Sequence, residues 1–221
     1  MPPLYNLPPL ILQTLIWIPT RIVLKYMYHL EIRGLEHIKN LNRGVVFAAN
    51  HTSELDAILI PACLPFLSKH MPMFYTCREK SFYKDKRFGW KKHIYGGIFF
   101  NVWGAFEVAV GKKDYTQALA QHEHILKDGH SVCIFPEAKK NPEEFDLRAK
   151  GGVAYLAFAA HVPIVPVKIE GAVKKDKIVV SFGKPLYEKD LFPNPNAPTI
   201  SESKNDFKDA AALVMKKIRE V

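Results

Sequence analysis

Residues 45–56 read VVFAANHTSELD, an apolar run that leads into a polar turn with a histidine and an aspartate five positions apart. The run over residues 45–49 is short and apolar, which predicts a buried β-strand. In layered α/β proteins, the loops at the carboxyl ends of such strands carry the chemistry. His51 and Asp56 therefore lie where a functional site is expected.

The pair of His51 and Asp56 suits general-base chemistry. A general base needs a group that titrates near neutral pH and a partner that fixes its tautomer. Because five helical residues turn through about 500°, the two side chains meet only if His51 is on the loop and Asp56 is in the first helical turn. Ser53 and Asp56 have the spacing of an N-cap and an acidic third helical residue, which allows this. The same spacing is also consistent with a simple helix start, in which His51 is only a polar loop residue.

The rest of the chain alternates short apolar runs with helical patterns. Strands are predicted over residues 44–49, 73–77, 131–135, 164–169 and 177–182. Helices are predicted between the cap Asp114 and the stop Gly129, over residues 152–160 and over residues 205–221. This alternation predicts the α/β class, with a central, mostly parallel sheet flanked by helices. Because no internal repeat or low-complexity linker is evident in the middle of the chain, residues 31–221 are expected to form one domain.

The first 30 residues are expected to form a separate, strongly apolar helical segment. Its apolar run is interrupted by Pro19, Arg21 and Lys25. A spanning helix needs about 20 mostly apolar residues with few charges, so these interruptions argue against a simple bilayer crossing. The absence of a basic residue before Arg21 also argues against a secretory signal. The remaining interpretations are a helix packed on the core and an interfacial helix or bent helix pair on the membrane, and we assign residues 1–30 to the interfacial class.

Composition and charge narrow the class of protein. With 221 residues, 48% of them apolar, the chain can bury a substantial core, which argues against a disordered protein. The net charge of +9 points to anionic partners such as membrane headgroups, phosphorylated metabolites or nucleic acid. Basic residues are densest over residues 78–92, where aromatic residues interleave with them. This stretch is either a solvated face or a functional surface that contacts a membrane or stacked bases.

Cysteine usage indicates no metal or disulfide chemistry. The three cysteines are far apart in the sequence and lack the paired spacing of metal ligands. They are expected to be unpaired structural thiols in a reducing compartment. No metal site is predicted.

Four blocks, in order, resemble the glycerolipid acyltransferase family, whose best known members acylate 1-acylglycerol 3-phosphate. The blocks are residues 50–56 (NHTSELD), residues 104–108 (GAFEV), residues 135–137 (FPE) with Lys150-Gly151-Gly152 downstream, and residues 162–167 (VPIVPV). The first is similar to the family's signature of a histidine, four residues and an aspartate. The resemblance covers about residues 31–185, and the ordered set is far more specific than any single block.

The resemblance implies an O-acyltransferase of phospholipid biosynthesis or remodelling. Such an enzyme moves a fatty acyl group from an acyl thioester, either acyl-CoA or acyl carrier protein, to a hydroxyl of a lysophospholipid. The resemblance implies that His51 is the general base and that Asp56 orients it, with no cofactor and no enzyme nucleophile. Backbone amides near the start of the next helix are candidates for stabilising the oxyanion. The implied location is peripheral, on the cytoplasmic side of a membrane surface, with no nucleic acid partner.

Two blocks depart from the family's pattern where the family carries cations. After the second block, Ala109 and Val110 stand in place of an arginine, and Lys112 is among the nearest cations. In the third block, residues 138–140 (AKK) stand for glycine, threonine and arginine. A lysine can balance a phosphate only as a point charge, without the bidentate fork of arginine. Two kinds of acceptor are therefore consistent with the sequence: a phosphate-bearing lysolipid held by lysines, or a different lysolipid.

The residues expected to bind substrate follow from the same blocks. They are Glu137, Lys139, Lys140, Lys150 and Lys112. For Glu137 a structural role, as a hydrogen-bond acceptor that holds nearby loops, is also open. Two rival functions remain: a catalytically silent lipid-binding protein with the same fold, motivated by the missing arginines, and a nucleic-acid binder, motivated only by the charge.

Overall fold

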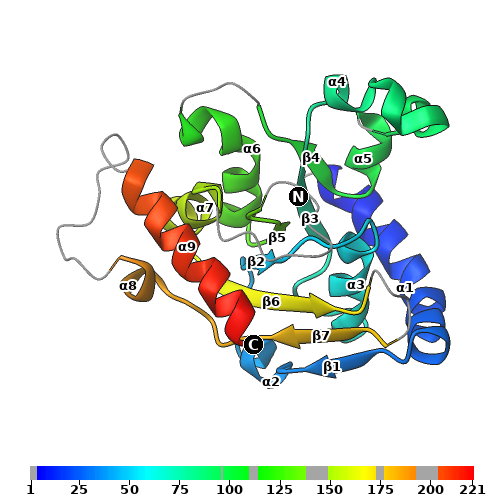
Figure 1. Ribbon diagram of the computed structural model, residues 1–221, viewed down its shortest axis with the longest axis horizontal. Coiled ribbons are helices and arrows are strands. Elements are labelled where there is room, and N and C mark those ends of the chain that lie inside the picture. The colour runs from blue at the N-terminus through cyan, green and yellow to red at the C-terminus, as the bar shows by residue number, and fades with distance from the viewer. Residues whose placement is uncertain (1–3, 96, 110–113, 138–148, 173–176, 193–203) are drawn as a thin grey trace.

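The computed structural model describes residues 4–95, 97–109, 114–137, 149–172, 177–192 and 204–221 (Figure 1). Its strands are β1 (Glu31–Arg33), β2 (Val46–Ala49), β3 (Met73–Cys77), β4 (Ala105–Glu107), β5 (Ser131–Ile134), β6 (Ile164–Glu170) and β7 (Val179–Phe182). They form one sheet in the order β1-β7-β6-β2-β5-β3-β4, in which β6 and β7 are antiparallel and the other neighbours are parallel. The predicted α/β class, with a mostly parallel sheet, is confirmed.

Helices and helical turns connect these strands. They are η1 (Leu4–Asn6), α1 (Leu7–Met27), α2 (Glu36–Lys39), α3 (Asp56–Cys63), α4 (Lys80–Tyr83), η2 (Lys86–His93), α5 (Ile98–Val102), α6 (Tyr115–Lys127), α7 (Gly152–Ala160), α8 (Glu188–Leu191) and α9 (Lys204–Glu220). Asp114 caps α6 as predicted, because its side chain accepts a hydrogen bond from the backbone N–H of Thr116. Gly129 follows α6 with φ of +83°, a conformation that glycine adopts at low cost.

Both faces of the sheet are buried, and the alternation along β2 shows how. Val46 and Ala48 belong to a core cluster with residues of α6, α7 and α9. Phe47 and Ala49 point to the opposite face, where they join a cluster with residues of α1 and α3. The helix predicted over residues 205–221 is α9, and its apolar stripe packs on the first of these clusters through Phe207, Ala211, Val214 and Ile218. Helices therefore cover the central strands on both sides, as expected for a parallel sheet.

Two edge strands differ from the prediction. No strand was predicted for the residues of β1 or β4, each of which has three residues. Such short segments carry no readable alternation, and their extended form depends on the partner strand: β1 pairs with β7 and β4 pairs with β3. The predicted strand over residues 177–182 is also shorter, since β7 begins at Val179.

The apolar N-terminal segment is a single helix, α1, rather than a bent pair. Gln13 fixes it to the sheet, because its amide donates to the carbonyl of Met73 and accepts from the N–H of the same residue, both at 2.8 Å. Further along, the Arg21 guanidinium donates to the carbonyl of Ala62 at 2.6 Å. By length and composition alone, α1 meets the requirements for crossing a membrane. Its polar contacts instead tie it along the side of the domain.

A buried histidine predicts how stability depends on pH. His122 of α6 is inaccessible to solvent, and this burial lowers the pKa of its imidazole to about 4. The unfolded chain, with a pKa near 6.5, then binds a proton more readily than the folded chain. The free energy of unfolding should therefore fall between pH 6.5 and 4, by about 3 kcal/mol from this residue.

Chemical denaturation of the wild type and of His122→Gln at several pH values measures this contribution. The variant should lose this part of the pH dependence. The buried His70 and the partly buried His130, whose pKa values are also lowered by desolvation, still contribute in both proteins. If the free energy of unfolding changed with pH in the same way in the two proteins, the assignment to His122 would be contradicted.

Candidate active site

The loop after β2 brings the two predicted catalytic side chains together. Nδ1 of His51 lies 2.9 Å from Oδ2 of Asp56. The Asp56 side chain is completely buried, whereas the His51 side chain is 20% exposed. His51 is on the loop and Asp56 is the first residue of α3, which is the arrangement that the spacing required. One end of the imidazole therefore contacts a buried carboxylate while the ring remains accessible to solvent.

The hydrogen bonds around Asp56 fix the tautomer of His51. Oδ2 accepts from the backbone N–H groups of Thr52 and Ser53, at 2.6 and 2.8 Å. Oδ1 accepts from the hydroxyls of the same two residues, at 3.2 and 2.9 Å. An ionised carboxylate only accepts hydrogen bonds, so Nδ1 of His51 must carry the proton that it donates to Asp56. Nε2 of the neutral ring is then the basic nitrogen, and within the described part of the chain it makes no hydrogen bond.

These contacts correct two details of the predicted loop. Ser53 does not cap α3, because its hydroxyl donates to Asp56 and accepts from the N–H of Leu55 within a turn that precedes the helix. The amides of Thr52 and Ser53 are also directed at Asp56. The three amides of Thr52, Ser53 and Leu55 therefore do not offer the oxyanion site that was suggested for the start of this helix. The amides of Thr52 and Ser53 build a cradle for the carboxylate instead, and the amide of Leu55 donates to the Ser53 hydroxyl within the same turn.

Phe135 holds the His51 ring from one side. The two rings are stacked, with centroids 4.2 Å apart and planes inclined by 19°. Strand pairing explains this contact: β2 and β5 are parallel, and Ala48 is aligned with Ile134, so the residues that follow leave the sheet side by side. Phe135 belongs to the third of the sequence blocks described above, but no role was predicted for it. Its contact with His51 depends on the register between β2 and β5, and no local sequence pattern indicates it.

Asn50 anchors the same loop from the other side. Its side-chain amide donates to the carbonyl of Ile169 at 2.9 Å and accepts from the N–H of that residue at 2.7 Å. Asn50 is 2% exposed, so these bonds satisfy a buried amide in the way that β-sheet pairing would. The position just before His51 is therefore fixed to β6. A polar residue directly after an apolar strand was the only sequence signal for this role.

The predicted substrate-binding residues are only partly described by the structure. Glu137 follows β5 and is 5% exposed. Lys150 is exposed, and its backbone N–H donates to the carbonyl of Pro136 at 2.9 Å, which places it beside the end of β5. The other three, Lys112, Lys139 and Lys140, lie outside the described residues. The structure therefore brings Glu137 and Lys150 to the same edge of the sheet as His51 and Asp56.

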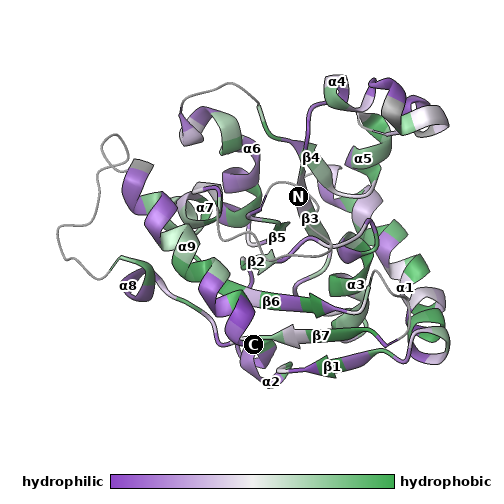
Figure 2. Ribbon diagram, viewed as in Figure 1, coloured by the Kyte–Doolittle hydropathy of each residue, from purple (hydrophilic) through white to green (hydrophobic). Residues whose placement is uncertain are grey.

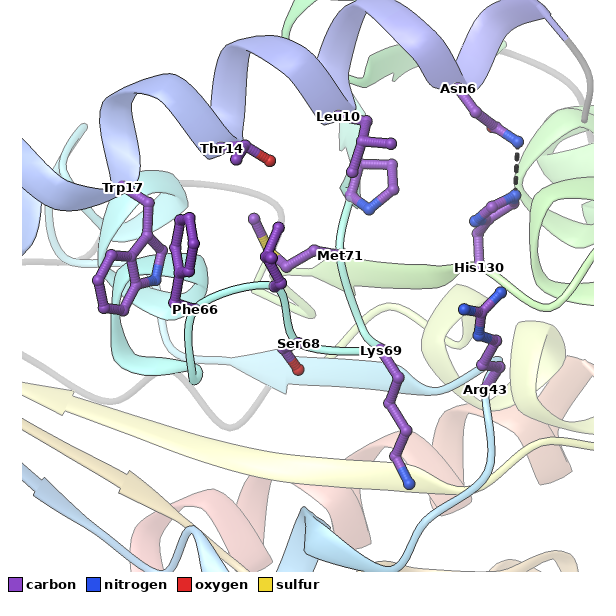
Figure 3. Close-up of a pocket in the computed structure, with 12 residues that line it drawn as sticks. Asn6, Leu10, Thr14, Trp17, Arg43, Phe66, Ser68, Lys69, Met71 and His130 are labelled. Carbon is purple, nitrogen blue, oxygen red and sulfur yellow. Dashed lines mark hydrogen bonds between the residues drawn. The ribbon is translucent and has the colours of Figure 1, made fainter.

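A cavity of about 310 Å³ lies at the opposite edge of the sheet, under α1 (Figure 3). Its lining residues include Arg43, His130 and Met71, which precede β2, β5 and β3. Because these strands are parallel, the cavity faces their amino ends and His51 faces their carboxyl ends. Among the described residues, no group of three or more His, Cys, Asp or Glu side chains is placed to hold a metal ion. In the part of the chain that the structure describes, the carboxyl edge carries the His–Asp pair, whose imidazole is accessible to solvent.

Fold and site together define a class of protein: an α/β domain whose central strand presents an accessible histidine, oriented by a buried aspartate, at the carboxyl edge of the sheet. Comparison with known proteins agrees with this class. The family model described as Acyltransferase matches residues 29–170. This chain therefore belongs to the acyltransferase family.

Two individual proteins show how far the similarity extends. A "Probable 1-acyl-sn-glycerol-3-phosphate acyltransferase" from Mycoplasma pneumoniae is 24% identical over 134 residues, which cover 59% of this chain and 46% of that protein. The match thus spans about half of the length of this curated relative. The crystal structure of the 1-acyl-sn-glycerophosphate (LPA) acyltransferase PlsC from Thermotoga maritima superposes with a TM-score of 0.59 and 17% identity, over 96% of this chain and 80% of that one. It shares the fold.

Proposed function

We propose that this protein transfers a fatty acyl group from an acyl thioester to a hydroxyl of a lysophospholipid, such as 1-acylglycerol 3-phosphate. The observation that carries the proposal is the His51–Asp56 pair, in which Nδ1 is bound to a buried carboxylate and Nε2 is left basic. Membership of the acyltransferase family supports the reaction type. The name of the Mycoplasma relative supports the acceptor class.

In the proposed mechanism, Nε2 of His51 removes the proton of the acceptor hydroxyl while its oxygen attacks the thioester carbonyl. Asp56 stabilises the imidazolium that forms and keeps the ring in position. The tetrahedral intermediate then collapses, the C–S bond breaks, and the leaving thiolate takes the proton from the imidazolium. Atoms and charge balance without an enzyme nucleophile or a cofactor, because the thioester itself supplies the activated acyl group.

Cations around the carboxyl edge are proposed to hold the polar end of the acceptor. Lys150 is exposed beside the end of β5. In the sequence, Lys139 and Lys140 follow β5, and Lys112 follows β4. Glu137, at the end of β5, is proposed to contact substrate or to hold the adjoining loops. Because lysine does not impose the bidentate geometry of arginine, this set suits a phosphate without demanding one. The acyl donor in this proposal is either acyl-CoA or acyl carrier protein.

The surface of α1 supports a location on a membrane. The polar side chains of Gln13 and Arg21 face the domain, and exposed apolar residues form a stripe on the other side of the helix. Figure 2 shows that hydrophobic residues predominate along α1. The stripe consists of Leu7, Ile11, Leu15, Ile18, Ile22 and Tyr26, which are each 49–69% exposed. This polarity is the reverse of that of a soluble surface helix, which turns its apolar side inward. We propose that residues 1–30 form an interfacial segment beside the domain of residues 31–221, which sits peripherally on the cytoplasmic face.

An acceptor panel tests the proposed function. Purified protein is incubated with acyl-CoA or acyl carrier protein thioester and with lysolipids that carry or lack a phosphate, and thiol release and acylated product are measured. Transfer to at least one lysolipid is expected. A folded protein that binds lipid but releases no thiol with any acceptor would identify a catalytically silent lipid-binding protein and overturn the proposal.

Phe135→Leu should reduce kcat/KM about two- to twelvefold, because the stacked ring that restrains His51 is worth about 0.5–1.5 kcal/mol. Phe135→Tyr keeps the aromatic face and should retain most of the activity. Both variants should unfold at temperatures close to that of the wild type, since Phe135 is only partly buried. Equal loss of activity in the two variants would show that stacking is not what positions the imidazole.

A further inference from the structure

Residues 78–95 and 97–103, here called the 78–103 lobe, form a separate small lobe built from α4, η2 and α5 next to β3 and β4 (Figure 1). The lobe has its own aromatic core, in which the Tyr83 ring contacts the rings of Phe88, Tyr95 and Phe100 at centroid distances of 5.2–5.9 Å. Burial raises the pKa of Tyr83 to about 12. The lobe is therefore a packed unit.

Two hydrogen bonds attach the lobe to the carboxyl edge of the sheet. The hydroxyl of Tyr95 donates to Oε2 of Glu54 at 3.0 Å, and Glu54 lies in the loop between His51 and Asp56. The backbone N–H of Lys80 donates to Oε1 of Glu107 at the end of β4, also at 3.0 Å. The lobe thus stands next to the proposed active site and is bonded to the loop that carries it.

The outer surface of the lobe combines exposed apolar groups with positive charge. The exposed fractions are 82% for Ile98, 71% for Trp90 and 44% for Phe99. Residues 78–92 contain seven basic and two acidic residues, so this stretch carries a net charge of +5 out of +9 for the whole chain. Lys84 and Lys86, which lie between the aromatic residues, are exposed. Such a surface suits a lipid bilayer, in which an anionic headgroup layer covers an apolar interior.

The lobe also continues the apolar surface of α1. Helix α5 packs against α1, and the Gln13 amide that docks α1 donates to the carbonyl of Trp103 at 3.1 Å. Figure 2 shows hydrophobic residues along both helices. The surface proposed to contact the membrane therefore extends from α1 across α5 onto the lobe that carries Trp90.

We propose that the 78–103 lobe is a second interfacial anchor, which inserts Trp90 and Ile98 into an anionic bilayer and seats the His51 edge of the sheet on the lipid surface. The inference rests on the proposed function, in which the acceptor is a lipid of that bilayer. An acidic carrier protein or a nucleic acid would match the lysines but would leave Ile98 and Phe99 in water. The apolar groups therefore favour a bilayer as the occupant.

Sedimentation with vesicles, in the absence of substrates, tests the charged part of the surface. Vesicles of phosphatidylglycerol and phosphatidylcholine are compared with pure phosphatidylcholine at constant salt. Replacing two lysines in Lys84→Gln/Lys86→Gln should weaken partitioning onto the anionic vesicles about 25-fold, or about fivefold for each lysine. The control Lys208→Gln/Lys216→Gln removes the same charge from α9, on the other side of the molecule, and should bind as the wild type does (Figure 1).

Two further measurements test the apolar part. Ile98→Asp should lower partitioning onto both kinds of vesicle by about tenfold or more, because an apolar side chain no longer leaves water. The fluorescence of the wild type minus that of Trp90→Phe reports on Trp90, and brominated phosphatidylcholine should quench it. Equal vesicle binding by the two lysine-pair variants would overturn the proposal, and so would absence of quenching at Trp90. Single-stranded DNA binding that is preferred over vesicles at matched salt and is lost in Lys84→Gln/Lys86→Gln would also overturn it. If the wild type transfers no acyl group but the vesicle results hold, only the proposed function fails.

Discussion

His51→Ala is expected to lower turnover by about 10²- to 10⁴-fold, the usual contribution of a positioned general base. The imidazole supplies the basic Nε2, and in the described part of the chain the Asp56 carboxylate is bound only to it and to the donors of Thr52 and Ser53. The loss should appear in kcat more than in KM, because Nε2 acts on a proton that moves in the transition state. Steady-state kinetics on the best acceptor of the panel measure both constants.

A matched control separates this role from the general effect of losing a histidine. His124 of α6 also lies beside a carboxylate, with Nε2 3.5 Å from Asp128, but on an exposed helical surface. His124→Ala should keep wild-type turnover. His51→Ala should also stay folded, since Asp56 retains its four other donors. A folded His51→Ala protein with near-normal turnover would remove His51 from the mechanism.

The parts of this molecule that could be predicted from the sequence depend on local patterns. The apolar run before His51 and the spacing to Asp56 are contained within a dozen residues, so strand, loop and pair could be placed together. The helix cap at Asp114 and the stripe of α9 are equally local. In contrast, β1 and β4 become strands only through their neighbours.

The contacts that orient His51 could not be predicted, because they depend on strand register. Phe135 reaches the imidazole because β5 is aligned with β2, and Asn50 reaches Ile169 because β6 lies on the other side. The sequence separation of Asn50 and Ile169 is 119 residues. The loop also folds differently from a simple helix start: Asp56 collects the amides that were expected to face a substrate. A spacing motif names the chemical groups, but the surrounding sheet decides which donors meet which acceptors.

Asp56→Asn is expected to reduce kcat/KM by about 10²- to 10⁴-fold while the protein remains folded. Oδ2 of Asp56 accepts three hydrogen bonds, from the imidazole of His51 and the amides of Thr52 and Ser53. If the NH₂ group of an asparagine took this position, its N–H groups would point at these three N–H donors and no hydrogen bond could form. The asparagine oxygen must therefore take that place, and its NH₂ group then faces the hydroxyls of Thr52 and Ser53, which can rotate to accept. The hydrogen bond to Nδ1 survives in this arrangement, but the negative charge that stabilises the imidazolium is lost.

Stability and activity should consequently respond to different degrees. The charged hydrogen bonds become neutral ones, which should lower the free energy of unfolding by about 1–3 kcal/mol. Ser53→Ala is the matched control, because it removes a hydroxyl donor from Oδ1 and leaves the charge in place. It should cost about 1 kcal/mol of stability but less than about tenfold in kcat/KM. Steady-state kinetics and chemical denaturation are measured on both variants. If kcat/KM falls in proportion to the free energy of unfolding in the two proteins, Asp56 only builds the loop. A loss of kcat/KM that is much larger in Asp56→Asn than its loss of stability shows that the charge of Asp56 acts on His51 during the reaction.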